Sequence, residues 1–333
     1  MIREKARARV ASFALPAMWG AVAVTYKLTC PLAQQNGLGA RIASSAVFLA
    51  VGTGLIAGVR RGPLRELARF REIARAAQRV LLRPLPPRLD GLAVAAGQLS
   101  AHRNADVGGD LYEAVATDHG VRVVMGDVRG HGLAPIGTAA AVLGSFREAA
   151  HDERELCGVL RRLERALRRH LGGADEEFVT VLLLEIRDDG SVFALNCGHP
   201  WPYRLGRASA VVDRLCGAEP LPPLGPFPLP ESLPARYCGR IRPGEVLLLH
   251  TDGVEDARDA DGRFFPLHRT LTEAASARTP DPDELVDSLR GALLRHTGGR
   301  YGDDMALLAL RNDRHRVPRQ SGAVTKSRTS SGS

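Results

Sequence analysis

The chain has 333 residues, 44% of them hydrophobic, so it can bury one substantial core and carry additional segments. Its formal net charge of +8 suggests a nucleic-acid partner, but residues 60–88 hold nine arginines against two glutamates, and residues 89–312 carry a net charge of −8. Because a nucleic-acid-binding domain needs a basic face on its folded body, this distribution argues against nucleic acid as a partner.

Cysteine and lysine usage excludes further classes. The five cysteines, at positions 30, 157, 197, 216 and 238, form no C-x-x-C pair and no zinc-binding spacing, which favours a reduced, cytosolic compartment for the body of the chain. Lysine occurs only at positions 5, 27 and 326. The body therefore offers no lysine for a phosphate-binding P-loop.

Two runs without a charged side chain, residues 10–26 and 42–59, open the chain. Each is 17 or 18 residues long, at the short end of what spans a bilayer. Basic residues precede the first run and follow the second, so the positive-inside rule puts both ends of such a hairpin in the cytoplasm. The sequence predicts a membrane anchor over residues 1–62, with transmembrane helices at about 10–27 and 42–59, and a multi-pass protein of the cell membrane.

Three other interpretations of these runs are open. They could be buried helices of a soluble domain, or an amphipathic pair lying in the membrane interface. The first run could also be a signal peptide, since a basic segment precedes it. A second apolar run and a cytosol-like body follow the first run, and this favours the two-span anchor.

A juxtamembrane linker is predicted over residues 63–88. Apolar side chains such as Leu67 and Phe70 recur at helical spacing over residues 63–83, and three prolines between positions 84 and 87 end the helix. The arginines on its other face either contact anionic lipid or form a solvated linker face. One hypothesis is that this helix pairs between two subunits of a homodimer.

The body, residues 89–312, mixes strands and helices. Strands are predicted at 92–98, 111–116, 121–126, 178–186, 191–196, 236–241, 245–250 and 305–310, and helices at 133–150, 156–171 and 282–296. Hairpins dominate, with Asp189-Gly190 as a strong turn signal, and the two long helices are consecutive. This pattern favours an α+β sandwich of antiparallel sheet covered by helices over a doubly wound parallel sheet. Residues 313–333 are polar and are predicted to be a disordered tail.

Acidic residues beside glycine, or beside a second acid, stand at the edges of four apolar runs. The motifs are Gly109-Asp110, Gly126-Asp127, Asp252-Gly253 and Asp303-Asp304. Taken singly, each is more often a turn, a bulge or a strand entry. Together, carboxylates at strand ends can point into a shared cleft, and such clusters bind hard divalent cations such as Mg²⁺ or Mn²⁺.

In this order, the motifs resemble those of the metal-dependent protein serine/threonine phosphatases of the PPM, or phosphatase 2C, type, and within them the bacterial branch typified by the stage II sporulation phosphatase (SpoIIE). The resemblance runs from about residue 73 to residue 310. It rests on residues 77–82 with the proline stop that follows, and on segments 107–110, 126–132, 178–180, 196–200, 223–225, 251–257 and 303–306. It implies a phosphatase 2C-like α-β-β-α sandwich, with two antiparallel sheets flanked by helices, preceded here by the transmembrane hairpin.

The resemblance also implies a centre of two Mn²⁺ or Mg²⁺ ions. Its protein ligands would be the bridging Asp127, the main-chain carbonyl of Val128, Asp110, Asp252 and Asp303, with Asp304 as the alternative to Asp303. Two such ions can lower the pKa of a bridging water for in-line attack on phosphorus, so no serine nucleophile is expected. Asp127 and Asp252 would therefore serve catalysis as well as metal binding.

The chain departs from the eukaryotic members of this family at two points. Those members place a histidine two residues after the bridging aspartate, where this chain has Arg129; His131 follows, as a general acid or as a residue that starts the next helix. For the arginine that clamps the phosphate, Arg103 and Arg129 are the candidates. Segment 196–199 is expected to form a turn, with Cys197 in the core; a functional role for Asn196 and His199 is the alternative.

The implied function is a membrane-anchored phosphatase whose catalytic domain faces the cytoplasm. It would hydrolyse phosphoserine or phosphothreonine on a regulatory protein such as an anti-sigma-factor antagonist. A catalytically weak or inactive signalling module of the same fold is the first alternative, but it would require the loss of metal ligands, and all the acids are present. A nucleotide cyclase would account for Gly108-Gly109-Asp110 but leaves Asp252 and Asp303 without a role.

Overall fold

The computed structural model describes residues 19–22, 25–26, 29, 42, 45–54, 81–99, 109–130, 134–172, 177–206, 212–276 and 281–314. The chain divides into two compact units, residues 1–73 and 74–333. Several predictions concern residues outside these ranges. They are residues 63–80 of the predicted linker helix, the predicted tail beyond residue 314, and the site candidates Arg103 and His131.

In the N-terminal unit, every described residue is helical, and two helical segments contact each other. The indole N–H of Trp19 donates a hydrogen bond to the Phe48 carbonyl at 3.2 Å. The Phe48 ring lies 5.6 Å from the Trp19 ring and 5.3 Å from the Tyr26 ring, centroid to centroid. Among the described residues, no helix has the length and hydropathy that a membrane crossing requires. The transmembrane hairpin therefore stays a prediction.

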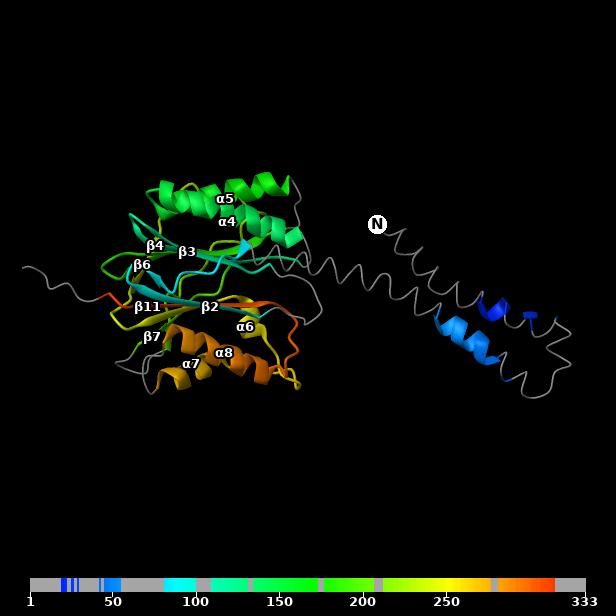
Figure 1. Ribbon diagram of the computed structural model, residues 1–333. Coiled ribbons are helices and arrows are strands. Elements are labelled where there is room, and N and C mark those ends of the chain that lie inside the picture. Colours follow the sequence, from blue (N-terminus) through cyan, green and yellow to red (C-terminus); the bar gives the residue numbers. More distant parts are fainter. Residues whose placement is uncertain are drawn as a thin grey trace, which may run out of the picture. The chain divides into compact units, whose positions relative to one another are not determined.

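The C-terminal unit has four layers, with helices outside and two antiparallel sheets inside (Figure 1). Sheet I has the order β3 (Leu111–Thr117), β4 (Gly120–Val128), β5 (Val179–Ile186), β6 (Ser191–Cys197) and β9 (Arg236–Arg240). Sheet II has the order β1 (Arg88–Leu89), β2 (Leu92–Leu99), β11 (Met305–Asn312), β10 (Val246–His250), β7 (Tyr203–Leu205) and β8 (Val212–Arg214). These strands and helices confirm the predicted α+β sandwich.

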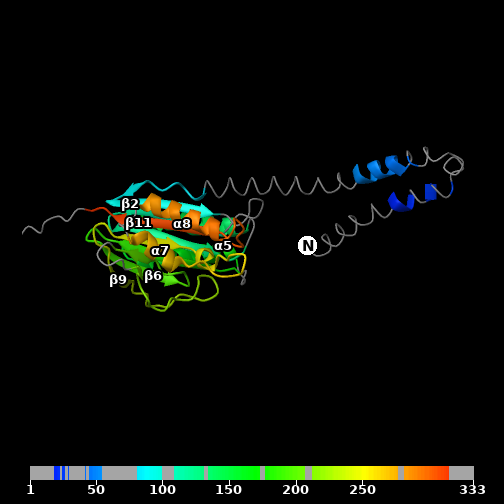
Figure 2. The same cartoon turned by 90° about the horizontal axis from the view of Figure 1, so that it is seen from below.

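Helices cover the outer face of each sheet. Helices α4 (Ala134–Asp152) and α5 (Leu156–Leu171) cover sheet I, while α7 (Leu267–Ala275) and α8 (Pro282–His296) cover sheet II. Figure 2 shows α8 lying along β2 and β11. The short helix α6 (Asp252–Asp256) follows β10 directly.

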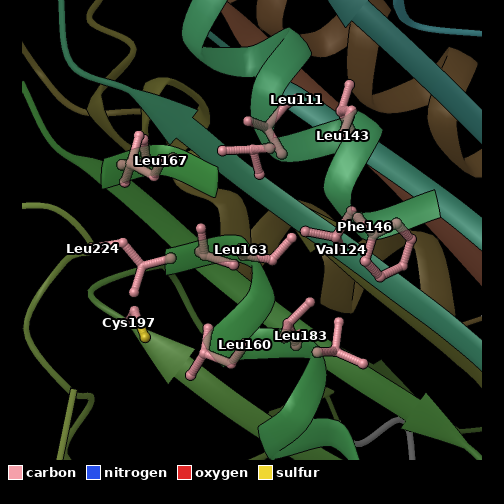
Figure 3. Packing of buried hydrophobic residues seen from close by; sticks show 14 of the residues in the cluster. Leu111, Val124, Leu143, Phe146, Leu160, Leu163, Leu167, Leu183, Cys197 and Leu224 are labelled. Carbon is pink, nitrogen blue, oxygen red and sulfur yellow. The ribbon is translucent and has the colours of Figure 1, made fainter. Parts of the chain in front are cut away.

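Burial on both faces explains why the central strands read as continuous apolar runs. In β4, Val123 and Met125 point into the core between the sheets, whereas Val124 and Val128 belong to the core beneath α4 and α5. Figure 3 shows part of this second core, where Phe146 of α4 packs in the same cluster as Val124. Packing on both faces thereby fixes the position of β4, which carries Asp127.

The predicted elements of the body agree with the observed ones to within two residues at each end. The prediction missed the short strands β1, β7 and β8 and the helices α6 and α7. The described residues also extend two positions past the predicted end of the body. There Arg314 donates from Nη2 to Asp90 Oδ2 at 2.7 Å and from Nε to the Asp90 carbonyl at 2.8 Å.

Candidate metal centre

Sheet I supplies Asp110 and Asp127 from the adjoining ends of two neighbouring strands. Asp110 precedes β3, and the residue after it, Leu111, is the ladder partner of Gly126 in β4. The Val128 N–H donates to the Gly109 carbonyl at 3.2 Å. The Asp110 side chain is buried, with only 3% of its residue surface exposed, and Asp127 is half-buried. Both carboxyl groups therefore lie at one edge of sheet I.

Sheet II supplies Asp252, Asp303 and Asp304 from the end of β10 and the approach to β11. The two segments are joined because the Thr251 N–H donates to the Ala306 carbonyl at 3.2 Å and the Ala306 N–H donates to Thr251 Oγ1 at 2.9 Å. Asp304 is buried, while Asp252 and Asp303 are exposed at the rim.

The two halves meet through a hydrogen bond between the sheets. Thr251 Oγ1 donates to Asp110 Oδ2 at 3.1 Å. This contact joins residues that are 141 positions apart in the sequence. The edge of sheet I that carries Asp110 and the edge of sheet II that precedes Asp252 thus form one site.

The pKa shifts of the acids indicate that their carboxyl groups lie close enough for their charges to interact. Burial, and then the charges of Asp127 and Asp304, raise the pKa of Asp110 well above its ordinary value. Burial, and then the charges of Asp252, Asp303 and Asp304, raise the pKa of Asp127 to about 7. Partial removal from water and the charge of Asp303 also raise the pKa of Asp252. All five acids singled out from the sequence are therefore gathered at one place.

The chemistry of this donor set fits hard divalent cations. The neighbouring charges that raise these pKa values most are all carboxylates, so a positive ion would relieve their repulsion. Within the described ranges, however, no three His, Cys, Asp or Glu side chains stand together in a group that could hold a metal ion. Magnesium-type sites keep several water ligands and need only a few carboxylates, so the donors present suit such an ion.

Arg129 lies exposed beside the acids. The main-chain N–H of Arg129 donates to the Phe178 carbonyl at 3.0 Å, and the Arg129 guanidinium lies 5.1 Å from the centroid of the Phe178 ring. The ring and the main chain of Phe178 thus hold the segment that follows Asp127 against the start of β5.

The turn expected at 196–199 is confirmed, and so is the buried cysteine. Asn196 Nδ2 donates to the His199 carbonyl and the His199 N–H donates to Asn196 Oδ1, both at 2.8 Å. Cys197 is fully buried, and this burial raises its pKa to about 12.

Three polar side chains lie around the acids; sequence reasoning missed Thr251 and Thr180, and it gave His199 a functional role only as the alternative to a turn. Thr251 bonds Asp110, Thr180 Oγ1 lies 3.2 Å from the main-chain nitrogen of Asp127, and His199 Nδ1 lies 3.0 Å from Thr180 Oγ1. Their only sequence signal was position, since each stands within or beside a segment that carried the resemblance.

Glycines at two positions let the main chains approach. A Cβ at Gly109 would collide with the Val128 carbonyl and would stand 2.8 Å from Asp127 Oδ1, and a Cβ at Gly253 would collide with the Asp304 carbonyl. Both obstacles are main-chain atoms, which cannot swing away as a side chain could. The two glycines therefore hold the acidic segments in contact within each sheet.

The variant Gly109→Ala is expected to lose about 1–3 kcal/mol of unfolding free energy, as is typical of overpacking, and to bind Mn²⁺ more weakly. Gly144→Ala is the matched control, because Gly144 lies within α4 and a Cβ there would meet nothing within 4 Å outside its own helix backbone. It should instead stabilise the protein by roughly 0.5–1 kcal/mol. Calorimetric melting with and without Mn²⁺ measures both effects; equal behaviour of the two variants would contradict the close-approach role.

Comparison with known proteins agrees with this architecture. The profile of the family described as stage II sporulation protein E (SpoIIE) matches residues 117–313. Protein IcfG of Synechocystis sp. is 31% identical over 126 residues, which are 37% of this chain and 18% of IcfG. The chain therefore spans less than a fifth of the length of that curated relative.

Solved structures show the same fold. The RsbU and RsbW domains of Rv1364c from Mycobacterium tuberculosis superpose with a TM-score of 0.54 at 26% identity, covering 66% of this chain and 60% of that one. The SiaA-PP2C domain of Pseudomonas aeruginosa superposes with a TM-score of 0.58 at 19% identity, covering 77% of this chain and 98% of that one. Because the family profile matches more than half of the chain, the protein belongs to the stage II sporulation protein E (SpoIIE) family, and its body has the phosphatase 2C, or PPM, fold.

Proposed function

We propose that this chain is a metal-dependent protein phosphatase that hydrolyses phosphoserine or phosphothreonine on a regulatory protein. Family membership supports a phosphatase or a regulatory module of the phosphatase 2C type. The observation that carries the catalytic proposal is the gathering of five carboxyl groups from both sheets, where the neighbouring charges that raise the pKa values of Asp110 and Asp127 are all negative. The match to the SpoIIE family argues against the nucleotide-cyclase alternative.

The proposed ligands of two Mn²⁺ or Mg²⁺ ions are Asp127, the Val128 carbonyl, Asp110, Asp252 and Asp303, with Asp304 as the alternative to Asp303. When bound, such a pair of ions supplies a water of lowered pKa and positive charge for the phosphoryl oxygens. The chain's own contribution is to hold these oxygens together. Thr251 orients Asp110, and the contact of Gly109 with Val128 keeps β3 and β4 in register at their ends.

Arg129 is proposed to contact the substrate phosphate. Its guanidinium is exposed, packs over the Phe178 ring, and belongs to the second residue after Asp127. A planar guanidinium can pair with two phosphoryl oxygens at once, which a lysine cannot do. Arg103 remains the other candidate for this contact. His131 is proposed as a general acid or as the residue that starts α4.

The N-terminal unit is proposed to anchor the protein in the cell membrane, with the catalytic domain in the cytoplasm. Large apolar side chains of its described helical residues face outward, and Leu49 is 73% exposed. Exposed apolar side chains on contacting helices suit a lipid environment better than water. A homodimer through the linker helix of residues 63–83 is part of the same proposal.

The test uses the full chain, purified in mild detergent, with phosphoserine and phosphothreonine peptides. Phosphate release is expected with Mn²⁺ or Mg²⁺, and none with a chelator. Asp252→Asn should abolish it, whereas Asp287→Asn, an exposed acid of α8 that pairs with Arg290 at 3.0 Å, should not. A folded protein that releases no phosphate with either metal would instead be the inactive signalling module.

Anchoring is tested separately, by fractionating cells that express the full chain. The protein should remain in the membrane pellet after an alkaline carbonate wash. Recovery in the wash would contradict the two-span anchor without affecting the proposed chemistry.

A further inference from the structure

A hydroxyl group lies against the main chain of Asp127. Asp127 of β4 and Thr180 of β5 are direct partners across the antiparallel ladder. The Asp127 N–H donates to Thr180 Oγ1 at 3.2 Å, and the same oxygen lies 3.5 Å from the Asp127 carbonyl oxygen. The Thr180 side chain therefore touches both polar main-chain atoms of the residue whose carboxylate lies among the acids.

The hydroxyl is held in turn by a buried histidine. His199 Nδ1 lies 3.0 Å from Thr180 Oγ1, and only 4% of the His199 surface is exposed. Burial lowers the pKa of His199 to about 3, so the ring is neutral. In either tautomer, Nδ1 and the hydroxyl form one hydrogen bond, which fixes the Thr180 side chain in a single rotamer.

The histidine itself has little freedom. The two hydrogen bonds with Asn196 clamp its main chain into the turn after β6. Gly198 has φ 73°, a conformation that favours glycine, and a Cβ there would stand 2.9 Å from the Pro223 ring. The ring of His199 is thus presented to Thr180 from a rigid turn.

We propose that Thr180 and His199 are positioning residues of the metal centre: His199 holds the Thr180 hydroxyl, and the hydroxyl holds the main chain of Asp127. The orientation of the Asp127 carboxylate and of the adjoining Val128 carbonyl then depends on the contact that Thr180 of β5 and His199, which follows β6, make with the main chain of Asp127. This inference rests on the proposed metal-binding role of Asp127. Outer partners of metal ligands commonly change metal affinity or activity by roughly 10–100-fold when they are removed.

The test compares loss of the hydrogen bond with its conservation. Thr180→Val keeps the shape of threonine and removes the hydroxyl, whereas Thr180→Ser keeps the hydroxyl. His199→Leu removes the ring nitrogen, whereas His199→Asn can place an amide oxygen where Nδ1 stood. Thr117→Val is the matched control, because Thr117 lies in the same sheet, at its other end, and its Oγ1 donates to Gly120 at 2.8 Å.

Calorimetric titration of the full chain with Mn²⁺ is the principal readout, and turnover of a phosphopeptide is the second. Thr180→Val and His199→Leu should weaken Mn²⁺ binding by roughly 10–100-fold. Thr180→Ser, His199→Asn and Thr117→Val should keep the wild-type affinity. If Thr180→Val does not fold, the pair His199→Leu and His199→Asn decides.

The outcomes separate the two proposals. A wild-type protein that binds no Mn²⁺ overturns the proposed function. If the wild type binds Mn²⁺ and the variants Thr180→Val and His199→Leu bind it equally tightly, only the positioning role is overturned. A loss in Thr117→Val equal to that in Thr180→Val would assign the effect to general destabilisation, and it would also overturn the positioning role.

Discussion

Asp127→Asn is expected to abolish metal-dependent turnover and, at the same time, to raise the stability of the metal-free protein. In the folded chain, burial and then the charges of Asp252, Asp303 and Asp304 raise the pKa of Asp127 to about 7. In the unfolded chain, the same carboxyl has an ordinary pKa of about 4. A carboxylate that is hard to ionise in the folded state destabilises that state once it is charged.

The sign of the pH dependence follows from this difference. As pH rises from about 4 to about 7, the unfolded chain releases this proton before the folded chain does, so the metal-free wild type loses stability across that window. Above pH 7 the whole cost is present, roughly 2–4 kcal/mol for this group. Asparagine carries no charge at any of these pH values, so the variant should lose less stability across this window, keeping only the decline that the raised pKa values of Asp110 and Asp252 cause.

Thermal melting of both proteins from pH 4 to pH 8, with a chelator and then with Mn²⁺, measures the effect. The wild type should melt higher when Mn²⁺ is added, and Asp127→Asn should gain far less. Asp189→Asn is the control for charge removal in general, because the Ser191 N–H, the Ser191 hydroxyl and Arg240 lower the pKa of Asp189. Its loss should destabilise. If Asp127→Asn melted below the wild type in chelator, the acids would not repel one another as described.

The fold could be predicted because its strands are buried on both faces or alternate cleanly. Residues 179–186 and 305–310 form apolar runs whose alternate side chains enter two different cores, so their strand character is visible in the sequence. The strands β7 and β8 are three residues each, too short to show any period. The helix α6 begins at Asp252 itself, where the sequence shows only a turn signal.

The acids of the site could also be predicted, because each is marked locally by glycine or by a second acid. Their partners could not, since these depend on register between strands. Thr180 reaches Asp127 only because the two residues face each other across β4 and β5, and Thr251 reaches Asp110 only because the two sheets pack face to face. The choice between Asp303 and Asp304 stays open, since the charges of both act on Asp127.

A buried arginine is the feature least visible in the sequence. Arg122 lies in the middle of the apolar run of β4, where a charged side chain would be expected to face water, yet none of its surface is exposed. Its Nε and Nη2 donate to Glu185 Oε2, at 3.1 and 2.8 Å, and Glu185 is its ladder partner in β5. It also donates to the carbonyls of Ala150 and Arg154 at 2.9 Å. Arg122 therefore ties sheet I to the end of α4 and to the connection that leads into α5.

Arg122→Met is expected to cost about 3–5 kcal/mol of unfolding free energy, because it leaves a buried carboxylate and several main-chain carbonyls without their donor. Arg187→Met is the matched control: Arg187 pairs with the same Glu185 at 3.0 Å, but its side chain is 54% exposed. An exposed pair contributes at most about 1 kcal/mol. Urea unfolding followed by circular dichroism measures both.

The double variant Arg122→Met with Glu185→Leu tests the reason for the loss. If the cost of Arg122→Met comes mainly from the unpaired buried charge, removal of Glu185 should restore much of the stability, since a buried ion pair can be replaced by apolar side chains at little cost. Should the double variant be as unstable as Arg122→Met alone, the cost would lie in the carbonyls at the end of α4. Arg122 would then act chiefly as the cap that holds the two helices on sheet I.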